Sequence, residues 1–326
     1  MELNLDFISK YRSSFMGLAI FWIFFYHTGI DIPGLRDLFA LGWFGVDIFF
    51  FVSGFGLCAS LSKNVSAKQF FQRRFFRIIP TWWFILIAMA IVGRWASLKG
   101  FPASGADYFY WFTGLGWWMG NCNFEWYIPT LLVFYLFSPF FAILSKKNLL
   151  IIIIATMVAA VILGYFQIFQ HVYMSYSRIP IFVTGFLVYK IKMTQAVIKT
   201  KIWLPLSLFG LAIFVVGMVI KYTNLTWGLT ISRVSIPMFI VPVLSIVAWI
   251  IGKCRPAEVL LSFLGLISLE IYLLHINHEF SEFIKTNLLS DVHSYLVKMT
   301  WFAIVVAASF MIHLLFTKIK FVRGRQ

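Results

Sequence analysis

His27 is the first residue of the chain with an evident chemical use, because it lies in the otherwise apolar segment FWIFFYHTG. An imidazole that a carboxylate orients can take a proton from a hydroxyl near neutral pH and so act as a general base. Asp47, in GWFGVDIFFFVSGF, and Glu125, in FEWYIP, are the carboxylates that we expect to orient it. The alternatives are a purely structural role for His27 and, for Glu125, an acid that stabilises the start of a helix.

Three arginines suggest a second kind of chemistry. Arg74 and Arg77 in FFQRRFFRIIP are three residues apart and so share one face of a helix, with Arg73 beside them. The planar fork of donors on a guanidinium group suits phosphate oxygens. The cluster therefore predicts either a site for a phosphorylated ligand or an anchor for anionic lipid headgroups.

The elements that carry these residues must lie in a lipid bilayer. Only 12% of the 326 residues are charged and 61% are apolar, which leaves too little polar surface to cover a water-soluble globule of this size. Apolar runs of about 20 residues, the length that a helix needs to cross a bilayer, follow one another with short loops between them. The sequence thus predicts an all-α, polytopic integral membrane bundle, with residues 1–326 as a single transmembrane domain and no appended soluble domain.

About ten transmembrane helices are predicted. They cover residues 13–32, 41–60, 78–97, 124–144, 149–168, 178–194, 203–220, 233–251, 259–277 and 296–316. With the N-terminus in the cytoplasm, 19 of the 27 Lys and Arg residues fall on the cytoplasmic side, as the positive-inside rule requires. The bundle is then N-in and C-in. The net charge of +15 comes from short clusters between apolar runs, so we expect membrane lipids rather than nucleic acid as a partner.

In this topology the buried charges gather near the outer face. His27 lies about 9 Å below the outer boundary, since about six residues separate it from the end of its span. Asp47 reaches a similar depth from the next span. Arg178 and His275 lie near the outer ends of two further spans, where they fit either acceptor-binding groups or interfacial side chains that reach toward headgroups. Aromatic residues at the same face suit sugar rings or an aromatic belt: Trp117, Trp118, Trp126 and Tyr127.

The order of these segments resembles the acyltransferase 3 family of bacterial membrane O-acyltransferases. The resemblance begins with the membrane histidine, the segment GWFGVDIFFFVSGF that contains Asp47, Ser53 and Gly54, and RRFFRIIP. It continues with EWYIPTLLVFYLFSP, RIPIFVTGFLVYK and LGLISLEIYLLH, and so covers most of the chain. It implies an enzyme that acylates sugars of cell-surface polysaccharides, lipopolysaccharide or related glycans, with acetyl-CoA as the usual donor.

The same resemblance implies roles for individual residues. His27 takes the position of the catalytic histidine, and Arg74 and Arg77 take those of the arginine pair that engages the donor. Many members of the family have a basic residue eleven positions before the histidine, where this chain has Met16. Arg12 lies one helical turn further from His27, on nearly the same face, and we expect its side chain to reach the same space.

We therefore predict a membrane O-acyltransferase, with acetyl as the expected group, that moves an acyl group from cytoplasmic acyl-CoA to a glycan or lipid-linked sugar at the outer face of the bacterial cytoplasmic membrane. Arg74, Arg77, Arg73 and Arg12 would bind the donor, and His27 would activate the acceptor hydroxyl, by direct transfer or through an acyl-histidine. No metal is expected.

Two other classes of protein remain as alternatives. A secondary transporter predicts substrate flux without bond formation. A non-catalytic partner of a glycan export pathway predicts that His27→Ala leaves function intact.

Overall fold

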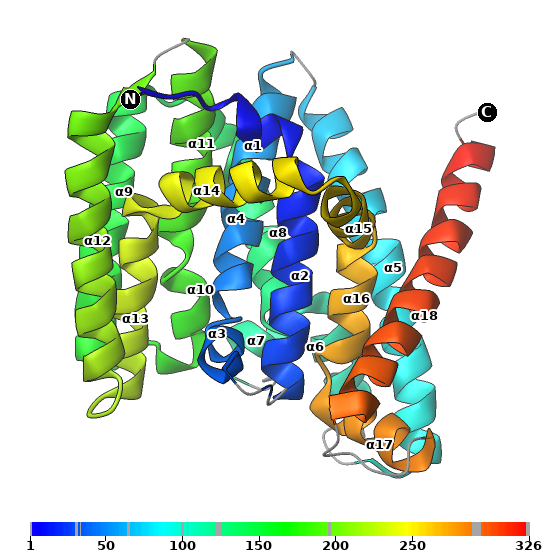
Figure 1. The fold of residues 1–326 in the computed structure, drawn as a ribbon. Helices are drawn as coiled ribbons and strands as arrows, with labels where there is room; N and C mark the ends of the chain where they lie inside the picture. Colours follow the sequence, from blue (N-terminus) through cyan, green and yellow to red (C-terminus); the bar gives the residue numbers. More distant parts are fainter. Residues whose placement is uncertain are drawn as a thin grey trace.

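The computed structural model of the chain consists almost entirely of helices (Figure 1). It describes residues 2–29, 32, 34–63, 66–98, 101–102, 104–120, 125–194, 197–288 and 295–323. Within these ranges the strands are β1 (Glu2–Leu3) and β2 (Ile198–Lys199), which pair antiparallel. The predicted all-α fold is confirmed.

The helices follow one another through short connections. In chain order they are α1 (Asp6–Lys10), α2 (Arg12–Thr28), α3 (Arg36–Ala40), α4 (Phe44–Leu61), α5 (Ala67–Trp95), α6 (Gly105–Thr113), α7 (Leu115–Trp118), α8 (Tyr127–Ile143), α9 (Lys146–Tyr165), η1 (Gln170–Val172), α10 (Tyr173–Tyr176), α11 (Ile179–Met193), α12 (Thr200–Ile220), α13 (Leu225–Ser235), η2 (Ile236–Met238), α14 (Ile240–Lys253), α15 (Arg255–Leu266), α16 (Ser268–His275), α17 (His278–Leu288) and α18 (Tyr295–Arg323).

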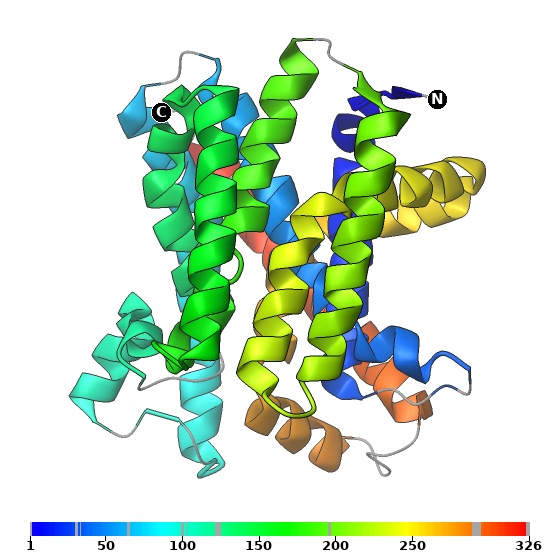
Figure 2. The same ribbon diagram turned by 90° about the vertical axis from the view of Figure 1, so that its left-hand side faces the viewer.

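Long helices run along one direction, and short helices collect at one end. Figures 1 and 2 show α2, α4, α8 and α11 in the interior, with α12 and α18 at the periphery. The short helices α3, α6 and α17 lie at the end of the bundle opposite to the N-terminus. α14 lies across the bundle near the N-terminal end. The start of α2 and the last turns of α18 lie toward the same end.

Five helices of the described residues, α4, α5, α9, α12 and α18, are long and apolar enough to cross a membrane, or up to seven if each of two bent pairs is one span. The sequence predicted about ten. The difference arises because α2 and α8 have 17 residues and α11 has 15, fewer than a bilayer of about 30 Å ordinarily needs. In α9, α12 and α18 only 22%, 17% and 17% of the most apolar stretch is buried, so their apolar side chains face outward, as they would toward lipid.

Two of the predicted spans are bent rather than straight. Residues 233–251 straddle a turn of 67° between the segments Leu225–Met238 and Ile240–Lys253. Pro237 lies in the short η2 segment just before the turn, where its missing N–H and its ring prevent a regular helix. Residues 259–277 straddle a turn of 65° between α15 and α16. The second bend starts a new helix at Ser268, and that helix ends with His275.

Glycines allow two close helix crossings that position the polar residues. A Cβ atom added at Gly17 of α2 would overlap the carbonyl oxygen of Leu261, and one at Gly265 of α15 would overlap that of Ser13. Without side chains at these points, α15 lies directly against α2. Because α16 continues from α15, this crossing sets its position relative to the far end of α2, where His27 lies.

The second crossing joins α4 and α11. A Cβ atom at Gly54 would overlap the carbonyl oxygen of Phe182, and one at Gly185 would overlap that of Phe51. The rings of Phe182 and Phe134 pack beside this contact, with centroids 4.7 Å apart. The crossing brings Asp47, in the first turn of α4, level with the start of α11.

Candidate functional site

His27 and His275 form a hydrogen-bonded pair, although 248 positions separate them in the chain. Nδ1 of His27 lies 3.0 Å from Nε2 of His275. His27 lies in the last turn of α2 and is exposed, whereas His275 closes α16 and is 3% exposed. We call these residues the histidine pair. It lies at the end of the bundle that carries α3 and α17.

The backbone fixes which nitrogens of the pair carry protons. Nδ1 of His275 lies 2.7 Å from the carbonyl oxygen of Ile271. Because a carbonyl can only accept, Nδ1 of His275 is the donor. With both rings neutral, Nε2 of His275 then accepts from Nδ1 of His27, and Nε2 of His27 is left with a free lone pair. The arrangement leaves an unprotonated ring nitrogen on an exposed residue, which is what a general base requires.

Asp47 and Arg178 form a buried ion pair beneath aromatic rings. Nε of Arg178 lies 3.3 Å from Oδ1 of Asp47, and the two side chains are 1% and 0% exposed. The guanidinium also lies over the ring of Trp126, 4.6 Å from its centroid. Arg233 is a second buried cation nearby, between the rings of Trp43 and Tyr173. Asp47 therefore neutralises arginine charge, and its contact is with Arg178 rather than His27.

Glu125 is buried and bound to a tryptophan. Its Oε2 accepts a hydrogen bond of 2.6 Å from the indole nitrogen of Trp82, on α5. The prediction that Asp47 or Glu125 orients His27 thus differs from the observed contacts, in which His275 occupies that position. Glu125 lies two residues before the start of α8, as the helix-start alternative requires. Its hydrogen-bond partner, however, is the side chain of Trp82.

The aromatic residues near this end are mostly internal. Trp117, Trp126 and Tyr127 are 3%, 8% and 7% exposed, and Trp118 is half-buried. The indole nitrogen of Trp117 donates to Oγ of Ser175 at 2.8 Å. An aromatic belt would place these rings at the lipid surface, so the structure does not support that interpretation for the three buried residues.

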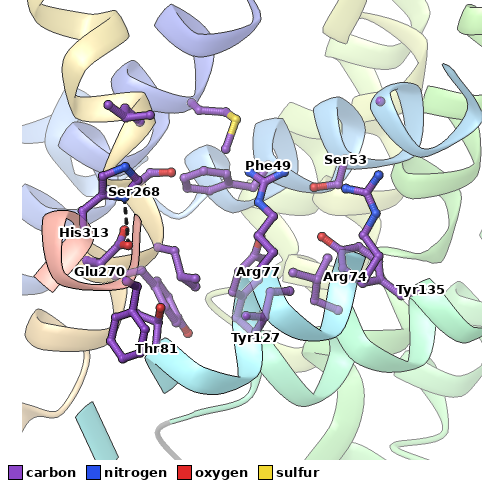
Figure 3. Close-up of a pocket in the computed structure, with 18 of the residues that line it drawn as sticks. Phe49, Ser53, Arg74, Arg77, Thr81, Tyr127, Tyr135, Ser268, Glu270 and His313 are labelled. Atoms are coloured by element: carbon purple, nitrogen blue, oxygen red, sulfur yellow. Dashed lines mark hydrogen bonds and ion pairs between the residues drawn. The ribbon is translucent and has the colours of Figure 1, made fainter. Parts of the chain in front are cut away.

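A cavity of about 310 Å³ lies in the other half of the bundle (Figure 3). This volume is at the lower end of the roughly 300–1,000 Å³ typical of small-molecule sites. Arg12, Arg74 and Arg77 all line it, so the structure brings together three of the four predicted donor-binding residues. Arg73, on the same helix, is exposed and does not line the cavity. We call this space the arginine cavity.

Arg12 reaches the cavity beside Met16, as its position one turn away predicts. Its guanidinium lies where α4 has Gly56: a Cβ atom there would be 3.2 Å from Nε and from Nη2 of Arg12. Arg74 lies over the rings of Phe70 and Tyr135, with centroids 5.4 Å and 5.9 Å away. Nε of Arg12 and Nε of Arg74 are buried and make no hydrogen bond to the described residues. Three like charges line the cavity, and the buried Nε donors of Arg12 and Arg74 have no partner in the described part of the chain, which favours an anion.

Tyrosine rings separate the cavity from the histidine pair. Tyr127 and Tyr272 line the cavity, with ring centroids 5.0 Å apart. The ring of Tyr272 contacts that of His275 at 5.9 Å, and His275 bonds His27. The arginines and His27 thus belong to one continuous line of contacts. Nothing in the sequence singles out Tyr272, because an isolated tyrosine in an apolar span is ordinary.

A carboxylate and a histidine of the cavity also escaped the sequence reasoning. Oε1 of Glu270 lies 3.2 Å from Nδ1 of His313, and both residues line the cavity. Glu270 was visible in the segment LGLISLEIYLLH as a charge inside a span, which is a signal that could have identified it. Among the described residues no group of three or more His, Cys, Asp or Glu side chains is placed to hold a metal ion.

Comparison with known proteins gives one match. A family model described as an acyltransferase domain, Acyl_transf_3, matches residues 17–318, nearly the whole chain. No curated protein and no solved structure matches it.

Proposed function

The chain belongs to the acyltransferase 3 family, and from this membership we propose that it is an O-acyltransferase that moves an acyl group from cytoplasmic acyl-CoA to a hydroxyl of a cell-surface glycan or glycolipid. Its apolar helices make it a multi-pass membrane protein. We assign the arginine cavity to the cytoplasmic side and the histidine pair to the outer side of the bacterial cytoplasmic membrane. This orientation puts both chain ends inside.

The observation that carries the proposal is the exposed position of His27 together with the bond from its Nδ1 to His275, which leaves Nε2 of the neutral ring unprotonated. A base in this state can take the proton of an acceptor hydroxyl. The hydroxyl oxygen then attacks the thioester carbon, the bond between carbon and sulfur breaks, and CoA leaves as a thiolate that takes up the proton held by His27, which returns the histidine to its neutral form. His275 shares the positive charge that develops on His27.

The arginines and tyrosines of the cavity would hold the donor in place. CoA phosphates bind Arg12, Arg74 and Arg77, because fork-like donors in a confined space suit phosphate oxygens. The pantetheine arm passes Tyr127 and Tyr272 toward the histidine pair.

Asp47 and Glu125 position the reacting groups indirectly. Asp47 neutralises Arg178 next to the acceptor side, and Glu125 holds Trp82.

The test is transfer of label across sealed vesicles. Acyl-labelled acetyl-CoA is supplied on the side of the chain ends, and native glycans and lipids on the other. We expect labelled acceptor with wild type and none with His27→Ala. Transfer by His27→Ala at the wild-type rate would favour a non-catalytic partner of a glycan export pathway. Flux of an unmodified substrate without bond formation would favour a secondary transporter.

A further inference from the structure

The Glu270–His313 pair has no part in the steps above, although it lies in the arginine cavity. Glu270 belongs to α16 and His313 to α18, and their side chains are 7% and 24% exposed. Phe316 and Thr317 of α18 line the cavity beside them. A largely buried polar pair of this kind adds little net stability compared with apolar side chains of similar size. Attachment of α18 alone would therefore not require this pair.

The pair divides the cavity into two chemical zones. Figure 3 shows Glu270 and His313 on one side of the cavity, Arg74 on the other, and Arg77 and Phe49 between them. A ligand with negative charge along its whole length would be repelled by the carboxylate of Glu270. The lining therefore suits a ligand that is anionic at one end and neutral, with N–H donors, at the other.

The position of Glu270 along α16 indicates which part of an acyl-CoA donor would lie beside it. Glu270 precedes His275 by five residues, which corresponds to about 7.5 Å along a helix. A thioester that reaches the histidine pair therefore has its phosphates well beyond Glu270. The part of the donor that lies at the depth of Glu270 is the pantetheine arm, whose polar groups are two amides and a hydroxyl.

We propose that Glu270 and His313 are donor-specificity residues that bind the amide of the pantetheine arm farther from the sulfur. This inference rests on acyl-CoA being the donor. The carboxylate of Glu270 accepts the amide N–H, and Nε2 of His313, which faces away from Glu270, bonds the polar groups beside that amide. Hydrogen bonds to this pair hold the arm at a fixed depth, so that the thioester carbon stops at His27.

Donors of three lengths test the proposal. Acetyl-CoA has the phosphates, the adenosine and both amides. Acetyl-pantetheine has both amides but neither phosphates nor adenosine, and the acetyl thioester of N-acetylcysteamine keeps only the amide nearer to sulfur. Each is assayed with wild type and with Glu270→Met/His313→Leu, which replaces the pair by apolar side chains of similar size. Ser14→Ala is the matched control, because it removes a contact between α2 and α15, Ser14 to Ser262 at 2.9 Å, outside the cavity lining.

We expect kcat/KM of the double variant to fall about tenfold or more for the two longer donors and to stay unchanged for the short one, because only the longer donors have the amide that loses its charged partner. Glu270→Gln should show the same pattern with a smaller loss. If the short donor turns over too slowly to measure, inhibition of acetyl-CoA turnover by pantetheine and by N-acetylcysteamine replaces it. The double variant should then bind pantetheine more weakly than wild type and bind N-acetylcysteamine equally well.

An equal loss for all three donors, or none, would overturn the inference and leave the pair as an attachment for α18. If wild type transfers from none of the donors, the proposed function itself fails.

Discussion

The histidine pair and the arginine cavity lie in opposite halves of one bundle, and they hold their polar groups differently. Around the histidine pair, each predicted residue contacts another side chain: His27 bonds His275, and Asp47 pairs with Arg178. Asp47 and Arg178 make no regular hydrogen bond to each other, but they face each other as an ion pair, whereas in the arginine cavity the described residues give Arg12 and Arg74 neither an ion pair nor a hydrogen-bond partner for Nε. Internal partners orient reacting groups before substrate arrives, whereas free guanidinium donors require a ligand to complete them. The comparison separates a site built for catalysis from a site built for binding.

The strongest test of this difference is removal of the base. His27→Gln should lower the transfer rate by a factor of about 10²–10⁴, the usual contribution of general base catalysis, with little change in KM for the donor. Rates are measured with labelled acetyl-CoA. The matched control is His171→Gln, another exposed histidine, whose Nε2 contacts the carbonyl of Trp118. An equal fall in the transfer rate with both variants, or no fall with either, would contradict a catalytic role for the histidine pair.

The ion pair of the same half can be broken without touching His27. Asp47→Asn should lower the free energy of unfolding by about 3–5 kcal/mol, because it leaves Arg178 buried without its counter-charge. Denaturation in detergent micelles measures the change. Asp47→Leu/Arg178→Met should recover most of it, since no buried charge remains. Asp6→Asn, at the exposed pair with Lys192, should cost less than about 1 kcal/mol. Equal losses of unfolding free energy at the two ion pairs would mean that burial does not make the Asp47–Arg178 pair special.

In the cavity the expected effect is on binding. Arg74→Gln/Arg77→Gln should raise KM for acyl-CoA about 100-fold, from two lost charge-assisted bonds of about 1.5 kcal/mol each, and leave kcat nearly unchanged. Arg73→Gln is the control, because Arg73 is exposed outside the cavity. A rise in KM that is as large with Arg73→Gln would mean that the cluster anchors the helix to headgroups.

The smallest effect sharpens the role of His275 as a positioning residue. His275→Leu removes the acceptor for Nδ1 of His27, and kcat should fall about tenfold. His275→Gln keeps an oxygen that can accept this hydrogen bond, so it should restore part of the rate. If the two variants are equally slow, His275 contributes to packing rather than to orientation.

Charges inside apolar runs could be found from the sequence because lipid makes them costly. That argument identified His27 and Asp47, whereas Arg74 and Arg77 were identified by their helical spacing and by the fit of guanidinium groups to phosphate. The family match confirms the resemblance that these residues suggested. The expectation that Arg12 joins them came from the family resemblance, which implies a basic residue at the position of Met16, together with the helical geometry that places Arg12 one turn away.

The partner of each charge could not be found in this way. His275 meets His27 only because Gly17 and Gly265 let α15 approach α2, and because α16 turns by 65° from α15. The contact between Glu270 and His313 depends equally on where α18 packs. Such contacts join residues far apart in the chain, and a single sequence does not record which helix faces lie together.

The layer formed by Tyr127, Tyr272 and His275 has a consequence for the cell as well as for the reaction. It lies between the arginine cavity and the exposed residue His27. In a protein that spans a membrane, an open water path between the two faces would let ions leak down their gradients. The buried rings of this layer, which contact one another edge to face, fill the space between the two sites and so oppose such a leak.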